Sequence, residues 1–293
     1  MLFYPQAEIA FFLVALAVLV SFLPRFRQYN TVRKTRVLIF IYSIALTTKI
    51  IDISYIYVVN MYGVGPFNIY YTLPLYSCDV TLIMAMVMTF FNLKSKGNNK
   101  TYEVINKLIT YLFIVNGLFI PLVNVSVVSL NKYLRYFNNP YHDIFSIDNA
   151  IVHNVYFILG FLYGSTFNVF NKTYKGFWKI CLVNAGITLV AHFVNLIMSV
   201  AGFETDYMYT ILYDSQTFTE IFSVFLGEEV ASVFIKIFQA PIIENYFGAI
   251  MVSVLLLAII YVFHRIYYKD GRKQGKDNLF YSNLINHNNS FIL

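Results

Sequence analysis

The chain has 293 residues, of which 58% are hydrophobic and only 12% are charged. Soluble globular domains carry roughly 25% charged residues, so this composition excludes an ordinary soluble protein and predicts a membrane protein. The 21 basic residues outnumber the 15 acidic ones. Because most of the basic residues flank apolar runs, they predict membrane topology, and no nucleic-acid partner is expected.

Seven apolar runs long enough to cross a bilayer follow one another along the chain. A hydrocarbon core of about 30 Å needs about 20 residues of helix, and a helix satisfies its own backbone hydrogen bonds in lipid. The predicted spans are residues 7–23, 36–60, 69–92, 103–128, 148–170, 177–200 and 245–268. The predicted fold class is therefore an all-α polytopic protein of the cell membrane, with seven transmembrane helices in a domain of residues 1–268.

The distribution of Lys and Arg between the spans predicts the orientation. The first, third and fifth connectors and the C-terminal tail together hold sixteen of these residues, against three on the opposite side. Cytoplasmic connectors carry the excess of positive charge. The N-terminus is therefore expected outside and the C-terminus in the cytoplasm, with the basic connectors lying on anionic lipid headgroups.

Two segments outside the spans differ from the spans in composition. The outer connector 202–244 is acidic, and its apolar stretch 218–243 is interrupted by Gly227, Glu228 and Glu229. It is expected to form helices that lie on the outer surface or re-enter the membrane. Residues 269–293 are polar and Asn-rich and are expected to form a cytoplasmic tail.

Polar side chains within the spans gather at similar depths. At 1.5 Å per residue, the following positions fall in the outer half of the bilayer or near its midplane. They are Lys49 and Asp52 in the second span, Cys78 and Asp79 in the third, His153 in the fifth, and His192 and Asn195 in the sixth. Because a charge near the bilayer centre costs at least about 2.5–3.5 kcal/mol, such groups face the bundle interior. We therefore predict a polar pocket, open to the outer leaflet or the outer surface, among spans 2, 3, 5 and 6.

Simpler interpretations apply to several polar residues. Lys49 and Asp52 are three positions apart and suit an ion pair on one helix. The inner half contains fewer polar groups, chiefly Asn116, Asn168 and Asn184, which are expected to join neighbouring helices. Cys181 lies near the inner surface, too far from Cys78 for a disulfide, and takes no part in the predicted site.

Three blocks of sequence resemble a known family. They are "LPLYSCDV" at 73–80, "DNAIVHNVYFILG" at 148–160 and "LVNAGITLVAHFVNLIMSVAGFETDYMYT" at 182–210. Their order and spacing resemble the YwaF-type bacterial integral membrane proteins, which are similar to the eukaryotic transmembrane protein 164 family. The resemblance covers roughly residues 36–268 and implies seven helices.

The resemblance also implies roles for particular residues. The eukaryotic relatives are regarded as acyltransferases acting on membrane phospholipids, with a cysteine nucleophile matching Cys78 and a histidine matching His153. The chain departs from the family at Tyr76, where relatives usually carry histidine, and at Asp206, where an asparagine is usual. His192 offers a second imidazole in place of the missing one.

Acyl transfer through a thioester suits these residues. A thiolate is the nucleophile, and an imidazole takes its proton, with a carboxylate such as Asp52 to orient the ring. Asp79 lies about 100° around the helix from Cys78, so it is expected to serve a neighbouring helix. The expected partners are membrane phospholipids, with a lysolipid or a lipoprotein amine as acceptor. No cofactor and no metal ion are expected.

Two other functions fit the same sequence. A small-solute transporter or receptor-like protein would use Lys49, Asp52 and Asp79 to bind a solute or an ion. A non-enzymatic subunit of a membrane complex would use the acidic outer connector as its docking surface.

Overall fold

The computed structural model describes residues 5–61, 77–94, 100–129, 142–170, 175–202, 229, 250 and 253–266. This part of the chain is helical and contains no β-strand. The helices are α1 (Pro5–Gln28), α2 (Thr31–Met61), α3 (Ser77–Lys94), α4 (Lys100–Ser129), α6 (His142–Thr166), α7 (Phe177–Val200) and the apolar helix Ser253–Ile266. Each of the seven predicted spans overlaps one of these helices, so the all-α class is confirmed.

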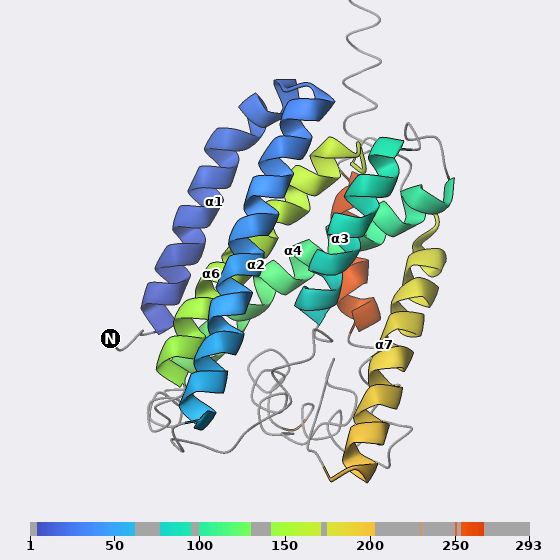
Figure 1. The fold of residues 1–293 in the computed structure, drawn as a ribbon. Helices are drawn as coiled ribbons and strands as arrows, with labels where there is room; N and C mark the ends of the chain where they lie inside the picture. Colours follow the sequence, from blue (N-terminus) through green and yellow to red (C-terminus); the bar gives the residue numbers. More distant parts are fainter. Residues whose placement is uncertain are drawn as a thin grey trace, which may run out of the picture.

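Helices α1 and α2 form a hairpin with a capped turn. The Asn30 side-chain oxygen accepts a hydrogen bond from the Arg33 backbone N–H at 2.9 Å, which satisfies a donor at the start of α2. The Arg33 guanidinium lies 4.0 Å from the centre of the Tyr29 ring. The basic Arg25 and Arg27 occupy the last turn of α1, where they complement the negative end of the helix dipole. These contacts explain why the chain reverses here, at the upper end of Figure 1.

The centre of the bundle is the packing of α4 against α6, and α4 crosses the bundle diagonally (Figure 1). Two glycines allow this close approach. A Cβ at Gly117 would lie 2.5 Å from backbone atoms of Phe157, and one at Gly160 would lie 2.6 Å from the Ile114 side chain. Small residues at helix crossings are typical of membrane proteins, because they let backbones approach.

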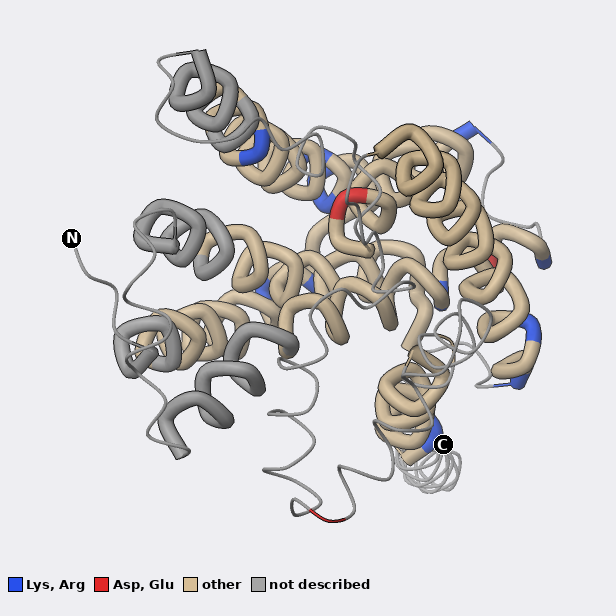
Figure 2. The backbone as a smooth tube through the Cα atoms, turned by 90° about the horizontal axis from the view of Figure 1, so that it is seen from below, with Lys and Arg blue, Asp and Glu red and all other residues tan. Residues whose placement is uncertain are grey.

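The outward faces of the helices are strongly apolar. Large side chains such as Phe40, Leu182 and Val200 are exposed, and most of each helix carries no charged residue (Figure 2). Three helical segments, Ala10–Gln28, Ser77–Lys94 and Phe177–Val200, are long and apolar enough to cross a membrane. Exposed apolar surface of this extent is stable in lipid and not in water, which identifies a membrane protein.

Several predictions concern parts of the chain that the model does not describe. Residues 69–76 of the third predicted span, nearly all of the outer connector 202–244 and the tail 269–293 lie outside the described residues. The division into a membrane domain and a tail, the orientation and the number of helices that cross the membrane therefore stay predictions.

Candidate functional site

Cys78 and Asp79 lie in the first turn of α3, next to a lysine of α2. The Asp79 carboxylate and the Lys49 ammonium are 3.3 Å apart, with the Asp79 side chain 5% exposed and the Lys49 side chain 21% exposed. Asp79 therefore serves a neighbouring helix, as its position on α3 predicts. The half-buried Cys78 directly precedes Asp79 in the same turn of α3.

The side chain of Asn116 on α4 forms hydrogen bonds with the first turns of α3. Its side-chain oxygen accepts a hydrogen bond from the Ser77 hydroxyl at 3.1 Å. Its amide nitrogen makes a longer contact of 3.5 Å with the Thr81 hydroxyl, which itself donates to the Ser77 carbonyl at 2.5 Å. The residues on both sides of Cys78 and Asp79 are thus held by one buried amide.

The same asparagine orients His153 of α6. The imidazole Nδ1 lies 2.5 Å from the Asn116 main-chain oxygen. A carbonyl can only accept, so Nδ1 carries the proton, and in the neutral ring Nε2 carries the lone pair. The ring also meets Tyr156 edge-on, with 6.2 Å between ring centres. His153 therefore presents Nε2 as a proton acceptor.

Lys49 of α2 belongs to the same arrangement as Cys78 of α3 and His153 of α6. Its ammonium is within electrostatic range of both the Cys78 thiol and the His153 imidazole. Helices α2, α3, α4 and α6 thus bring one group of residues together, which we call the Cys78 cluster. It consists of Lys49, Ser77, Cys78, Asp79, Thr81, Asn116 and His153.

Four other residues were predicted for the site, namely Asp52, Tyr76, His192 and Asn195. The side chains of Asp52 and Tyr76 lie outside the described residues. His192 and Asn195 are buried on α7, which packs against α4. Their part in a common pocket with Cys78 stays a prediction.

Sequence reasoning found most of the Cys78 cluster but missed the role of Asn116. It did predict that Asn116 joins helices, which the contacts with Ser77 and Thr81 confirm. The pair Asn116–Gly117 was the available signal, because the glycine marks the place where another helix approaches most closely. A polar residue beside such a crossing lies within reach of two neighbouring helices.

The expectation for Asn168 is contradicted, whereas that for Asn184 stays a prediction. The prediction for Asn168 is wrong: its side chain is exposed, and its φ of 54° places it in the left-handed region, where it closes the turn after α6. Asn184 is buried on α7, yet its amide nitrogen makes no hydrogen bond with the described residues.

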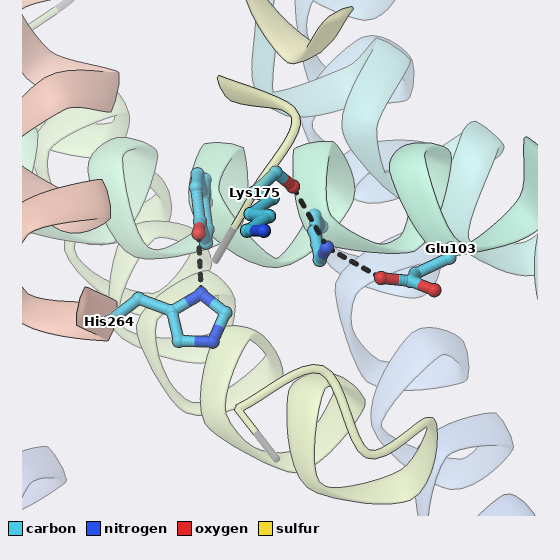
Figure 3. A network of polar contacts seen from close by, with 5 residues as sticks. Glu103, Lys175 and His264 are labelled. Atoms are coloured by element: carbon cyan, nitrogen blue, oxygen red, sulfur yellow. Dashed lines mark hydrogen bonds and ion pairs between the residues drawn. The ribbon is translucent and has the colours of Figure 1, made fainter. Parts of the chain in front are cut away.

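Two further buried polar side chains, Lys107 and His264, lie outside the Cys78 cluster. The smaller number of polar groups in the inner half stays a prediction, because it depends on the orientation. Figure 3 shows a network in which the Lys107 ammonium pairs with Glu103 at 2.6 Å and donates to the Lys175 carbonyl at 3.3 Å. In the same view, the Tyr111 hydroxyl and Nδ1 of His264 are 2.5 Å apart. These residues stand near the helix ends where the basic connectors begin, and long or aromatic side chains allow polar tips to meet beneath an apolar surface.

A second group of buried amides lies on α3 and α4. Asn92 and Asn106 exchange two side-chain hydrogen bonds of 3.0 Å, and the Tyr163 hydroxyl donates to Asn106 at 2.6 Å. Because these bonds link side chains of three helices, this group joins α3, α4 and α6 in the way that polar residues join membrane helices.

The Cys78 cluster is suited to nucleophilic chemistry. It contains a thiol, an imidazole with a proton acceptor, and a carboxylate and an ammonium beside them. Within the described part of the chain, no three His, Cys, Asp or Glu side chains gather in a way that would hold a metal ion.

Comparison with known proteins agrees with the resemblance seen in the sequence. The model of the TMEM164 family matches residues 2–233, a segment that includes Cys78 and His153. No curated protein and no solved structure gives a match. Since the family match covers well over half of the chain, this membrane protein belongs to the TMEM164 family.

Proposed function

We propose that the protein is a membrane-embedded acyltransferase. It moves an acyl chain from a phospholipid, through a thioester on Cys78, to a lysolipid or a lipoprotein amine at the outer leaflet. The TMEM164 family is loosely linked to acyl transfer, which supports the reaction class. The observation that carries the proposal is the orientation of His153 by the Asn116 carbonyl in the same cluster as Cys78.

The cluster suggests a sequence of proton and acyl transfers. The lone pair on Nε2 of His153 accepts the proton of the Cys78 thiol, and the sulfur attacks the carbonyl carbon of the ester. The C–O bond then breaks, and the imidazolium returns the proton to the leaving alkoxide of the lysolipid. In the second half, Nε2 of His153 takes the proton of the acceptor hydroxyl or amine as it attacks the thioester carbon. The carbon–sulfur bond then breaks, and the imidazolium returns the proton to the leaving Cys78 thiolate.

The exposed apolar surfaces of α2 and α3 suit a substrate that arrives from lipid. Ile50 and Ile51, which follow Lys49 on α2, are exposed, and Ile83 is exposed on α3, one turn after Asp79. An acyl chain that follows these surfaces would bring its ester close to Cys78. No soluble cofactor enters this scheme.

The direct test is detection of the thioester. The purified chain in lipid nanodiscs is incubated with a phospholipid that carries a deuterated acyl chain, and intact mass and peptide mapping follow. We expect an adduct on Cys78 that hydroxylamine removes. The Cys78→Ser variant should give none, whereas Cys181→Ser, which changes the second of the two cysteines, should match the native chain. An equal yield from Cys78→Ser would overturn the proposal.

One observation favours a second candidate, a small-solute transporter. The buried face of α7 is unusually polar for an apolar helix, with Asn184, Thr188, His192 and Asn195 on it. Polar residues on the inward side of membrane helices mark solute pathways in transporters. Solute uptake by proteoliposomes that is lost in Asn184→Leu but kept in Cys78→Ala would favour this function over acyl transfer.

A further inference from the structure

Lys49 occupies a boundary between lipid and the protein interior. Its neighbours Ile50 and Ile51 are exposed on the outside of α2, with Ile51 at 63%. The Lys49 side chain itself is only partly exposed, and its ammonium reaches inward to Asp79 of α3. A charge placed within a membrane helix is costly and usually marks a functional site.

The ammonium pairs with Asp79 at 3.3 Å, and Asp79 directly follows Cys78 in the first turn of α3. Lys49 is within electrostatic range of the Cys78 thiol and of the His153 imidazole. Among the described residues, the other charged group that acts on the thiol is Asp79, which is adjacent to it on α3. Asp79 therefore holds the ammonium at the first turn of α3, the turn that contains Cys78.

We propose that Lys49 is a catalytic residue whose ammonium stabilises the oxyanion formed when Cys78 attacks an acyl ester. This inference rests on the proposed function. As the carbon–sulfur bond forms, the π electrons of the carbonyl move onto its oxygen, and the negative charge develops close to Lys49. When the oxyanion collapses, the electrons re-form the carbonyl, and the alkoxide leaves with the proton from His153.

If the Lys49–Asp79 ion pair had a purely structural role, its replacement would affect stability and not the rate of acylation. Replacing both members of a buried ion pair by apolar residues of similar size is often neutral or stabilising, whereas removing one member is destabilising. The double variant Lys49→Met with Asp79→Leu therefore removes the charge with little loss of stability. A preorganised donor at an oxyanion, in contrast, contributes about 100- to 1,000-fold to the rate.

The experiment compares two reactions of the same thiol. In a Cys181→Ser background, Cys78 is the remaining cysteine. Acylation by p-nitrophenyl palmitate passes through a carbonyl oxyanion, but alkylation by iodoacetamide does not. Both rates are measured by intact mass for the native residue pair, for Lys49→Met/Asp79→Leu and for Lys49→Gln. Thr48→Val serves as the control, since the Thr48 hydroxyl bonds to the Ile44 carbonyl of its own helix at 3.0 Å.

We expect the acylation rate of the double variant to fall about 100-fold more than its alkylation rate. Lys49→Gln, which keeps a hydrogen-bond donor but not the charge, should show the same selective loss even if the double variant does not fold. Equal changes in the two rates, or unchanged acylation, would overturn the role of Lys49. A native chain that is acylated by p-nitrophenyl palmitate but not by phospholipid would overturn the proposed donor, while the ratio of rates would still decide the role of Lys49.

Discussion

The Nδ1 atom of His153 on α6 and the main-chain oxygen of Asn116 on α4 are 2.5 Å apart. Since a main-chain carbonyl is present whatever the side chain, this contact depends on how closely α4 and α6 pack and not on the asparagine amide. The amide instead bonds to Ser77, next to Cys78. One residue therefore aligns the candidate base and the candidate nucleophile through two different groups.

The first prediction separates the two nitrogens of His153. In His153→Asn, the side-chain amide can still donate to the Asn116 carbonyl, but no proton acceptor remains at the position of Nε2. General base catalysis contributes about 100- to 10,000-fold, so the rate of thioester formation on Cys78 should fall by at least about 100-fold. The melting temperature should stay close to that of the native chain. A folded variant with native acylation would show that His153 is not the base.

The second prediction concerns the crossing of α4 and α6. In Gly117→Ala, the new Cβ would lie 2.5 Å from the N, Cα and Cβ atoms of Phe157, so the helices must separate. Overpacking of this kind costs about 1–3 kcal/mol, and it should also reduce thioester formation, because His153 is one turn from Phe157.

A matched control for that change is Gly186→Ala on α7. A Cβ at Gly186 would have no atom of the described residues within 4 Å. Alanine is favoured over glycine within a helix by about 0.5–1 kcal/mol, so this variant should be as stable as the native chain or slightly more stable. Thermal unfolding in detergent measures both. Equal stability of the two variants would contradict the close packing at Gly117.

The third prediction compares the two members of the ion pair in Figure 3. The Lys107 side chain is 3% exposed, whereas that of Glu103 is 27% exposed. Glu103→Gln leaves a buried ammonium without its carboxylate, but Lys107→Met leaves a carboxylate that water can reach. Removing one partner of a buried pair costs about 3–5 kcal/mol, so Glu103→Gln should lower the melting temperature more than Lys107→Met does. A larger decrease in melting temperature for Lys107→Met would show that an unpaired Lys107 costs less than an unpaired Glu103.

The fourth prediction tests the amide pair between α3 and α4. Asn92→Leu and Asn106→Leu each remove two reciprocal hydrogen bonds of 3.0 Å, so the double variant has no further bonds of this pair to lose. Interhelical hydrogen bonds in membranes average about 0.6 kcal/mol, which predicts a coupling energy of about 1 kcal/mol in a double-mutant cycle. Additive losses of stability would show that the two amides act independently.

The fold class could be predicted from sequence because hydrophobicity along the chain is a local property. Each apolar run is predicted to lie in lipid, where a helix satisfies its own backbone hydrogen bonds and an irregular or open strand conformation does not. Each run also overlaps a helix of the structure. The family could also be recognised from local blocks around Cys78 and His153, and the match to residues 2–233 confirms it. The catalytic roles of these two residues stay predictions.

The partners of the polar residues were decided by the tertiary structure. Successive residues of a helix point about 100° apart, so a small rotation or shift of one helix changes which side chains meet. Packing brings Asp79 of α3 to the Lys49 ammonium, a contact that spacing along α2 does not predict. Packing likewise makes Asn116 the link between Ser77 and His153 and assembles the network of Lys107, which lies far from Lys175 in the sequence. Composition and run length determined the helices, and the rotation and spacing of those helices determined the site.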